Sequence, residues 1–193
     1  VARADLNAIN IDDRGRSEIT FGATADFAVS EGNKINGLAE IKELVLENED
    51  GIYNIGNITL TSVQDDKKYD IDLTSSFAEA TYSGTASPKN FVNDFTGLTL
   101  KKELPALYED AAYDWNGNTY RLNFKFNNSM DLLNFVMPGL YIDEGTMISA
   151  DVDRQGRFTA AVNSNRLAFK KNYLKGLNAA LNNADDALDC TLD

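Results

Sequence analysis

ITFGATADFAV, residues 19–29, alternates apolar and mostly polar side chains without a break. Successive side chains of a β-strand point to opposite faces, so this stretch predicts a long strand with one apolar face and one largely polar face. Ile19, Phe21, Phe27 and Val29 supply the large side chains of the apolar face. Strands of this type are typical of an antiparallel sheet that is covered on one side and solvated on the other.

The segment YRLNFKF, residues 120–126, repeats the pattern, and the segment around 147–152 continues it. Their apolar positions complete a set of candidate residues that form either the wall of a groove or the face of a core. The set is Ile19, Phe21, Phe27, Val29, Tyr120, Leu122, Phe124, Phe126, Ile148 and Val152.

Most of the chain predicts strands, roughly a dozen of them, so the expected fold class is mainly β. Residues 1–86 form a β-meander of short connections, which places consecutive strands side by side. Residues 87–137 form a helix–strand–helix unit and residues 138–193 return to strands. We expect residues 1–193 to be a single β-rich fragment of a longer protein, because the chain begins at Val1 and stops within an alternating segment.

Two short helices are expected where the apolar period changes. Ser87 and Pro88 are typical of an N-cap and a first helical position, so the first helix spans Pro88–Glu109, with a kink or end at Pro105. The second spans Met130–Met137, and its apolar side carries Leu132, Leu133, Val136 and Met137. Pro138 and Gly139 end it.

The apolar residues of the segment Ile35–Leu46 fit both the period of a helix and the period of a strand. Its spacing suits a helix, but Asn36 and Gly37 are poor residues for a helical start, so we favour a bulged strand.

The composition argues against several classes of function. A net charge of −12 and a pI of about 4.4 disfavour binding to nucleic acid. The chain has no histidine, and its Asp-rich loops 114–118 and 151–156 lack the last carboxylate of an EF-hand. We therefore expect no enzyme activity, no metal and no cofactor. The one cysteine, Cys190, is interpreted as a buried strand residue.

Four segments carry a resemblance to a known family: INGLAEIKELVLENEDGIYNIGNITLTS (35–62), YDIDLTSSFAEATYSG (69–84), LLNFVMPGLYIDEGTMISADV (132–152) and NYLKGLNAALNNADDAL (172–188). In these segments the chain resembles the C-terminal β-repeat region of TamB, the translocation and assembly module of the AsmA-like superfamily, in its Bacteroidetes form. The resemblance implies a large curved antiparallel sheet, like a half-barrel or β-taco, whose concave face is an apolar groove.

The resemblance further implies a cell-envelope protein in the periplasm, anchored in the inner membrane in its full-length form. Such proteins take part in outer-membrane biogenesis, through phospholipid transport between the membranes and through protein secretion and assembly. The implied partners are phospholipid acyl chains and an outer-membrane assembly protein of the Omp85 type. The family supplies no catalytic residues.

Three interpretations of the apolar face remain open. It forms a lipid groove, or it forms the closed core of a structural or interaction domain, or the chain is a hydrolase or carbohydrate-binding module. A single tryptophan, Trp115, argues against the third. Between the first two we expect a split, with Phe124 in a core under the helices and residues 19–29 in a groove wall.

Overall fold

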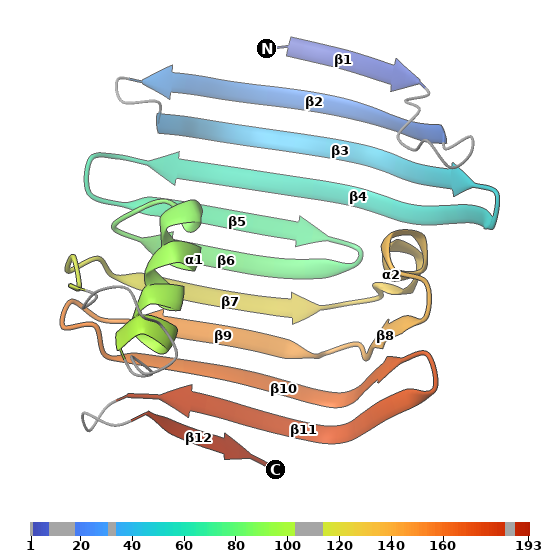
Figure 1. The fold of residues 1–193 in the computed structure, drawn as a ribbon. Helices are drawn as coiled ribbons and strands as arrows, with labels where there is room; N and C mark the ends of the chain where they lie inside the picture. The colour runs from blue at the N-terminus through green and yellow to red at the C-terminus, as the bar shows by residue number, and fades with distance from the viewer. Residues whose placement is uncertain (1, 8–17, 31–33, 103–113, 184–187) are drawn as a thin grey trace.

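A computed structural model describes residues 2–7, 18–30, 34–102, 114–183 and 188–193. Its twelve strands belong to one antiparallel sheet (Figure 1). Strands are the main secondary structure of the described residues, so the expected mainly β fold is confirmed. The strands are β1 (Ala2–Asn7), β2 (Glu18–Ser30), β3 (Lys34–Asn48), β4 (Gly51–Gln64), β5 (Tyr69–Ser75), β6 (Ala78–Gly84), β7 (Tyr120–Phe126), β8 (Leu140–Ile142), β9 (Met147–Val152), β10 (Phe158–Phe169), β11 (Asn172–Asn182) and β12 (Asp189–Leu192).

Consecutive strands are neighbours throughout most of the sheet. The order follows the chain from β1 to β7 and then continues through β9, β10, β11 and β12, while the short β8 pairs with β10. β1 and β12 lie at opposite edges of the sheet in Figure 1, and no pairing joins them in the described residues. The sheet is therefore open.

The ambiguous segment is a strand with bulges, as expected. β3 pairs with β4 along its length, with shifts of register on both sides of Leu44. Glu43 has a left-handed backbone (φ 53°), and its N–H donates to Asn57 Oδ1 at 3.0 Å. Opposite Leu44, Gly56 has φ 83°, and a Cβ there would lie 2.5 Å from Ser76 Oγ. The bulge therefore depends on a glycine at position 56.

The first helix begins as predicted and continues as a different kind of helix. α1 spans Pro88–Thr96, and the Ser87 hydroxyl caps it by accepting from the Asn90 N–H. A π-helical segment, Gly97–Lys102, follows directly. The remaining predicted residues, 103–109 with Pro105, lie outside the described residues.

The second helix, α2 (Met130–Val136), ends one residue earlier than predicted, because Met137 has an extended backbone. Its covered side also differs from the prediction. Leu133 is buried and Phe135 packs on Tyr53 of β4, with ring centroids 5.6 Å apart. Val136 and Met137, at the C-terminal end of the helix, are 60% and 48% exposed.

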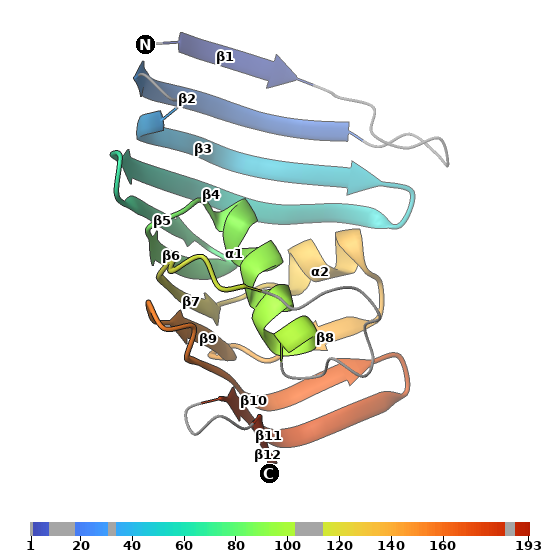
Figure 2. The ribbon, with the colours of Figure 1, turned by 60° about the vertical axis from the view of Figure 1, so that its left-hand side comes forward.

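Both helices lie on the same side of the sheet. Figure 2 shows the strands curving around that side, with α1 and α2 within the curve. The helices cover the middle strands and leave the strands at the two edges without a helix over them.

Candidate functional site

One face of the sheet is apolar across ten strands. In an antiparallel sheet, residues paired across neighbouring strands project from the same face, so the register can be followed from strand to strand. One such row is Ala25, Ala39, Leu60, Leu73, Ala80, Phe124, Ile148, Val162, Ala179 and Leu192. No polar side chain interrupts it.

The opposite face carries polar residues and ion pairs. A row there consists of Asp70, Ser83, Arg121, Asp151, Thr159, Asn182 and Asp189. Arg121 and Asp151 are direct cross-strand partners, and Arg121 Nε lies 2.7 Å from Asp151 Oδ2. The sheet therefore has the apolar and solvated faces that the alternation predicted.

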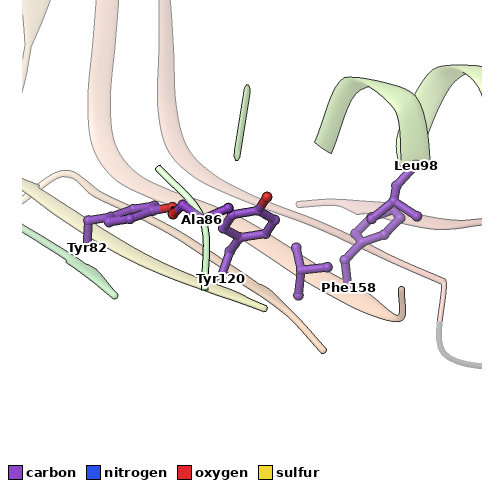
Figure 3. Packing of buried hydrophobic residues seen from close by; sticks show 6 residues of the cluster. Tyr82, Ala86, Leu98, Tyr120 and Phe158 are labelled. Carbon is purple, nitrogen blue, oxygen red and sulfur yellow. The ribbon is translucent and has the colours of Figure 1, made fainter. Parts of the chain in front are cut away.

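Part of the apolar face is a closed core beneath α1 and the π-helical segment (Figure 3). Tyr120, Val152 and Phe158 are each no more than 2% exposed, and Leu98 of the π-helical segment is fully buried above Phe158. Phe95 of α1 meets Phe158 edge-to-face, with ring centroids 5.2 Å apart. These contacts attach the helix to β7, β9 and β10.

A polar clasp holds α1 in this position. Asp94 of α1 accepts hydrogen bonds from the Tyr120 hydroxyl and from the side-chain amides of Asn116 and Asn118, the amide distances being 3.0–3.1 Å. Burial raises the pKa of Tyr120 well above its usual range, and the hydrogen bond to Asp94 raises it further. Burial likewise raises the pKa of Tyr82, whose hydroxyl donates to the Ala86 carbonyl. Both phenols stay protonated at ordinary pH.

Beside this core, the apolar face opens into a groove of about 430 Å³. Phe91 and Phe95 of α1 form one wall, and β7, β9, β10, β11 and β12 form the floor. The lining residues are Phe91, Phe95, Leu122, Ile148, Ser149, Ala150, Ala160, Ala161, Val162, Ala179, Ala180, Leu181 and Cys190. None of them carries a formal charge, and the volume is within the range of about 300–1,000 Å³ that small-molecule sites occupy.

Small side chains explain why this part of the face is hollow. The cross-strand row Leu122, Ala150, Ala160, Leu181 places two neighbouring alanines on the floor, and Ala179 lies one row away. A methyl group projects much less from the sheet than the rings of Tyr120 and Phe158 do. The hollow lies above these alanines, with Phe91 and Phe95 of α1 at its side.

The structure divides the ten candidate residues among different environments. Tyr120 and Val152 belong to the closed core, whereas Leu122 and Ile148 line the groove, with Ile148 36% exposed. Phe124, expected in the core, is half-buried instead and packs edge-to-face on Phe126 at 4.8 Å.

The candidates on β2 lie away from the groove. Ile19 and Phe21 are half-buried. Phe27 pairs with Gly37 and Val29 with Ile35, but the side chains of Phe27 and Val29 lie outside what the structure describes. The sheet brings the β7 and β9 candidates together and separates them from those of β2 by four strands.

Cys190 is exposed, which corrects the expectation that it is buried. It lies on β12, and β12 is an edge strand whose four residues are all exposed. The alternation placed Cys190 on the apolar face correctly, but at this edge the described residues leave its side chain exposed.

Sequence reasoning did not identify the aromatic wall or the alanines as part of a site. Phe91 and Phe95 fall within the predicted first helix, Pro88–Glu109, but were not assigned to a site. Positions 150, 160 and 179 alternate in step with the large apolar residues and so lie on the same face. Alanines at these positions indicate where the side chains of that face are short.

The described residues offer no metal centre and no membrane-spanning helix. No three His, Cys, Asp or Glu side chains gather there closely enough to hold a metal ion. Across the same ranges, none of the helices has the length and apolar character needed to cross a membrane. The Trp115 ring N–H donates to the Arg154 carbonyl at 3.0 Å, and the ring packs edge-to-face near Tyr120, so Trp115 is part of the packing around the core.

Comparison with known proteins identifies no relative. No protein-family model, no curated protein and no solved structure matches the chain. The functional argument therefore rests on the groove and on the residues that form it.

Proposed function

We propose that this chain is a non-enzymatic, lipid-handling segment of a TamB/AsmA-like envelope protein, and that its groove beside α1 holds phospholipid acyl chains. The observation that carries the proposal is the groove itself, a hollow of about 430 Å³ lined by uncharged side chains. Apolar surface in contact with water is unfavourable, so a ligand that covers this surface gains free energy.

The shape of the apolar row supports an elongated ligand. The row continues from the groove towards β12 at one edge, where Leu192 is 70% exposed, and through Ala80 and Leu73 in the other direction. An acyl chain has the matching chemistry, since it is long, flexible and without hydrogen-bonding groups. A charged or hydrogen-bonding substrate would find no partner among the large side chains of the groove.

The wider setting belongs to the same proposal. The resemblance to TamB supports a periplasmic location, an inner-membrane anchor in the full-length protein, and an outer-membrane assembly protein of the Omp85 type as partner. Phospholipid movement between the two membranes is the role that fits an apolar groove.

Filling the groove tests the proposal. Ala160→Phe places a ring over the floor, whereas Thr159→Phe places the same ring on the opposite, exposed face of the same strand. We expect the wild type and Thr159→Phe to bind cis-parinaric acid, a fluorescent fatty acid, and Ala160→Phe to lose at least about tenfold in affinity, equivalent to about 1.4 kcal/mol. Equal affinity for all three proteins would contradict the proposal.

Cys190 provides a second readout because it is exposed and lines the groove. A bound fatty acid is expected to slow the reaction of the Cys190 thiol with a maleimide in the wild type. In Ala160→Phe the same addition leaves the rate unchanged. If fatty acid does not change the rate at which Cys190 of the wild type reacts with the maleimide, the ligand binds elsewhere.

The alternative is a structural or interaction domain, and the closed core of Tyr82, Leu98, Tyr120, Val152 and Phe158 favours it. In that case no lipid is found by mass spectrometry of an organic extract of the purified protein. Ala160→Phe then changes only stability, since a ring in an empty apolar hollow gains contacts without displacing a ligand.

A further inference from the structure

The apolar positions of β10 change sides before the strand ends. Val162 lies on the groove face, but Leu167 and Phe169 have the opposite parity. Leu167 still pairs with Leu174 of β11, and the pairing shows no shift of register. The end of the β10–β11 hairpin therefore presents apolar side chains on the side opposite to the groove.

Apolar side chains are exposed on both faces of this hairpin end. Phe169 and Leu174, which are 44% and 58% exposed, lie on the side opposite to the groove, and Tyr173, which is 61% exposed, points to the other side because it is next to Leu174 in the strand. Together with β8, Leu167, Phe169 and Leu174 line a shallow hollow of about 340 Å³. We call residues 166–175 the hairpin tip; in Figure 1 it lies at the end of the strands where α2 and β8 lie, away from α1.

The end of α2 lies at the base of the tip. The Lys170 N–H donates to the Gly139 carbonyl at 2.8 Å, and the Leu140 N–H donates to the Met137 carbonyl at 3.0 Å. Met137, 48% exposed, is thereby held next to the tip. These backbone bonds therefore place the segment that follows α2 next to the hairpin tip.

Cations of the tip lie over aromatic rings of the tip and of β8. Arg166 is 5.2 Å from the ring centroid of Tyr141 and 6.0 Å from that of Tyr173. Lys170 Nζ lies 5.2 Å from the ring centroid of Phe169, and Lys175 Nζ lies 5.5 Å from that of Tyr173. Positive charge and aromatic surface are therefore presented together.

The charge of the tip is opposite to that of the whole chain. Residues 155–183 contain five Lys or Arg and no Asp or Glu, while the chain as a whole has a net charge of −12. Asp143 is a carboxylate at the base of the tip, where it accepts a hydrogen bond from the Tyr141 hydroxyl at 2.6 Å. An anionic surface would attract this end of the molecule and repel the rest, so it would orient the molecule with the tip towards it.

We propose that the hairpin tip docks on the surface of an anionic phospholipid bilayer. Phe169, Tyr173 and Leu174 enter the interfacial region, and Lys170, Lys171 and Lys175 contact lipid phosphates. Aromatic rings and long cationic side chains are the residues that favour this region, because each has an apolar part and a polar end. This inference goes beyond the groove and does not depend on it, since the two surfaces share no residue.

Sedimentation with vesicles tests the proposal. We expect the wild-type chain to bind vesicles of phosphatidylglycerol and phosphatidylcholine, and to be released by high salt, because the lysine contacts are screened. Vesicles of phosphatidylcholine alone are expected to bind it at least about tenfold more weakly. Equal binding to both kinds of vesicle would overturn the proposal.

Matched variants separate the tip from general charge. Lys170→Gln, Lys171→Gln and Lys175→Gln together are expected to weaken binding to the anionic vesicles at least about tenfold. The control combines Lys67→Gln, Lys89→Gln and Lys125→Gln, which removes the same charge from exposed positions elsewhere, and it is expected to retain binding. The same loss in both triple variants would overturn the assignment to the tip.

A second pair tests the apolar contact. Leu174→Asn is expected to weaken vesicle binding, whereas Val63→Asn, at a side chain with a similar exposure of 63%, is expected to leave it unchanged. Retention of full binding by Leu174→Asn would show that the tip does not enter the bilayer.

Fatty-acid binding distinguishes the proposal for the groove from the proposal for the hairpin tip. The tip variants should still bind cis-parinaric acid, which also shows that they are folded, and Ala160→Phe should still bind anionic vesicles. Loss of vesicle binding in Ala160→Phe, with its fold intact by circular dichroism, would show that the groove and not the tip meets the membrane, and it would overturn the tip proposal alone.

Discussion

The first and last residues of β10 are both phenylalanines, and they allow the closed core to be compared with the open surface in one strand. Phe158 is 2% exposed and lies beneath Phe95 and Leu98, whereas Phe169 is 44% exposed at the hairpin tip. We predict that Phe158→Ala destabilises the protein far more than Phe169→Ala.

The magnitudes follow from burial. Removing a buried phenylalanine ring leaves a cavity and costs about 3–5 kcal/mol, and the loss of the edge-to-face pair with Phe95 contributes about 0.5–1.5 kcal/mol of that total. At Phe169 roughly half of the ring is already in water. The expected loss there is about half of the 1.5–3 kcal/mol for burying a phenylalanine, or about 0.8–1.5 kcal/mol, since water fills the space.

Urea unfolding followed by the strand signal in circular dichroism measures both values. The midpoint should fall much further for Phe158→Ala, while the slope of the free energy against urea should stay the same in all three proteins. Equal losses, or a loss at Phe158 below about 1.5 kcal/mol, would show that α1 does not close a core over β10 and would refute the description of the site.

Two further predictions concern the clasp between α1 and β7. Tyr120→Phe removes the hydroxyl that donates to Asp94. Hydrogen bonds to charged groups contribute about 1.5–3 kcal/mol, so we expect the unfolding free energy at neutral pH to fall by an amount in that range. A fall below about 0.5 kcal/mol would contradict the clasp. The raised pKa values of Tyr82 and Tyr120 predict that stability falls above pH 10, because the phenols ionise near their ordinary pKa of 10.0 in the unfolded chain while staying protonated in the folded one. Each such phenol contributes a slope of about 1.4 kcal/mol per pH unit, so urea midpoints measured between pH 9 and 11 should fall less steeply in Tyr120→Phe than in the wild type.

Local patterns in the sequence were sufficient for the elements of the fold. Strict alternation in residues 19–29 and 120–126 predicted β2 and β7, since a period of two has no other regular structure that fits it. Ser87 and Pro88 predicted the start of α1 through the capping groups that a helix needs. Glycine and asparagine at 36–37 decided the ambiguous segment in favour of β3.

Which parts of the apolar face are covered depends on contacts distant in the sequence. Tyr120, Leu122 and Phe124 have the same parity, yet one is buried under α1, one lines the groove and one packs on Phe126. The difference arises from the position of the helix over the sheet. Asp94 and the rings of Phe91 and Phe95 hold that helix in place through residues of β6, β7 and β10.

The sequence by itself determined the alternation, the two faces of the sheet and the start of the first helix, because each depends on neighbouring residues and on backbone preferences. Only the tertiary structure decided that Ala150 and Ala160 lie side by side to make a hollow, that Cys190 stays exposed at an edge, and that the cations of residues 166–175 gather around exposed rings. The physical reason is that exposure and charge density depend on strand register and on what packs above a strand, and both join residues that are far apart in the chain.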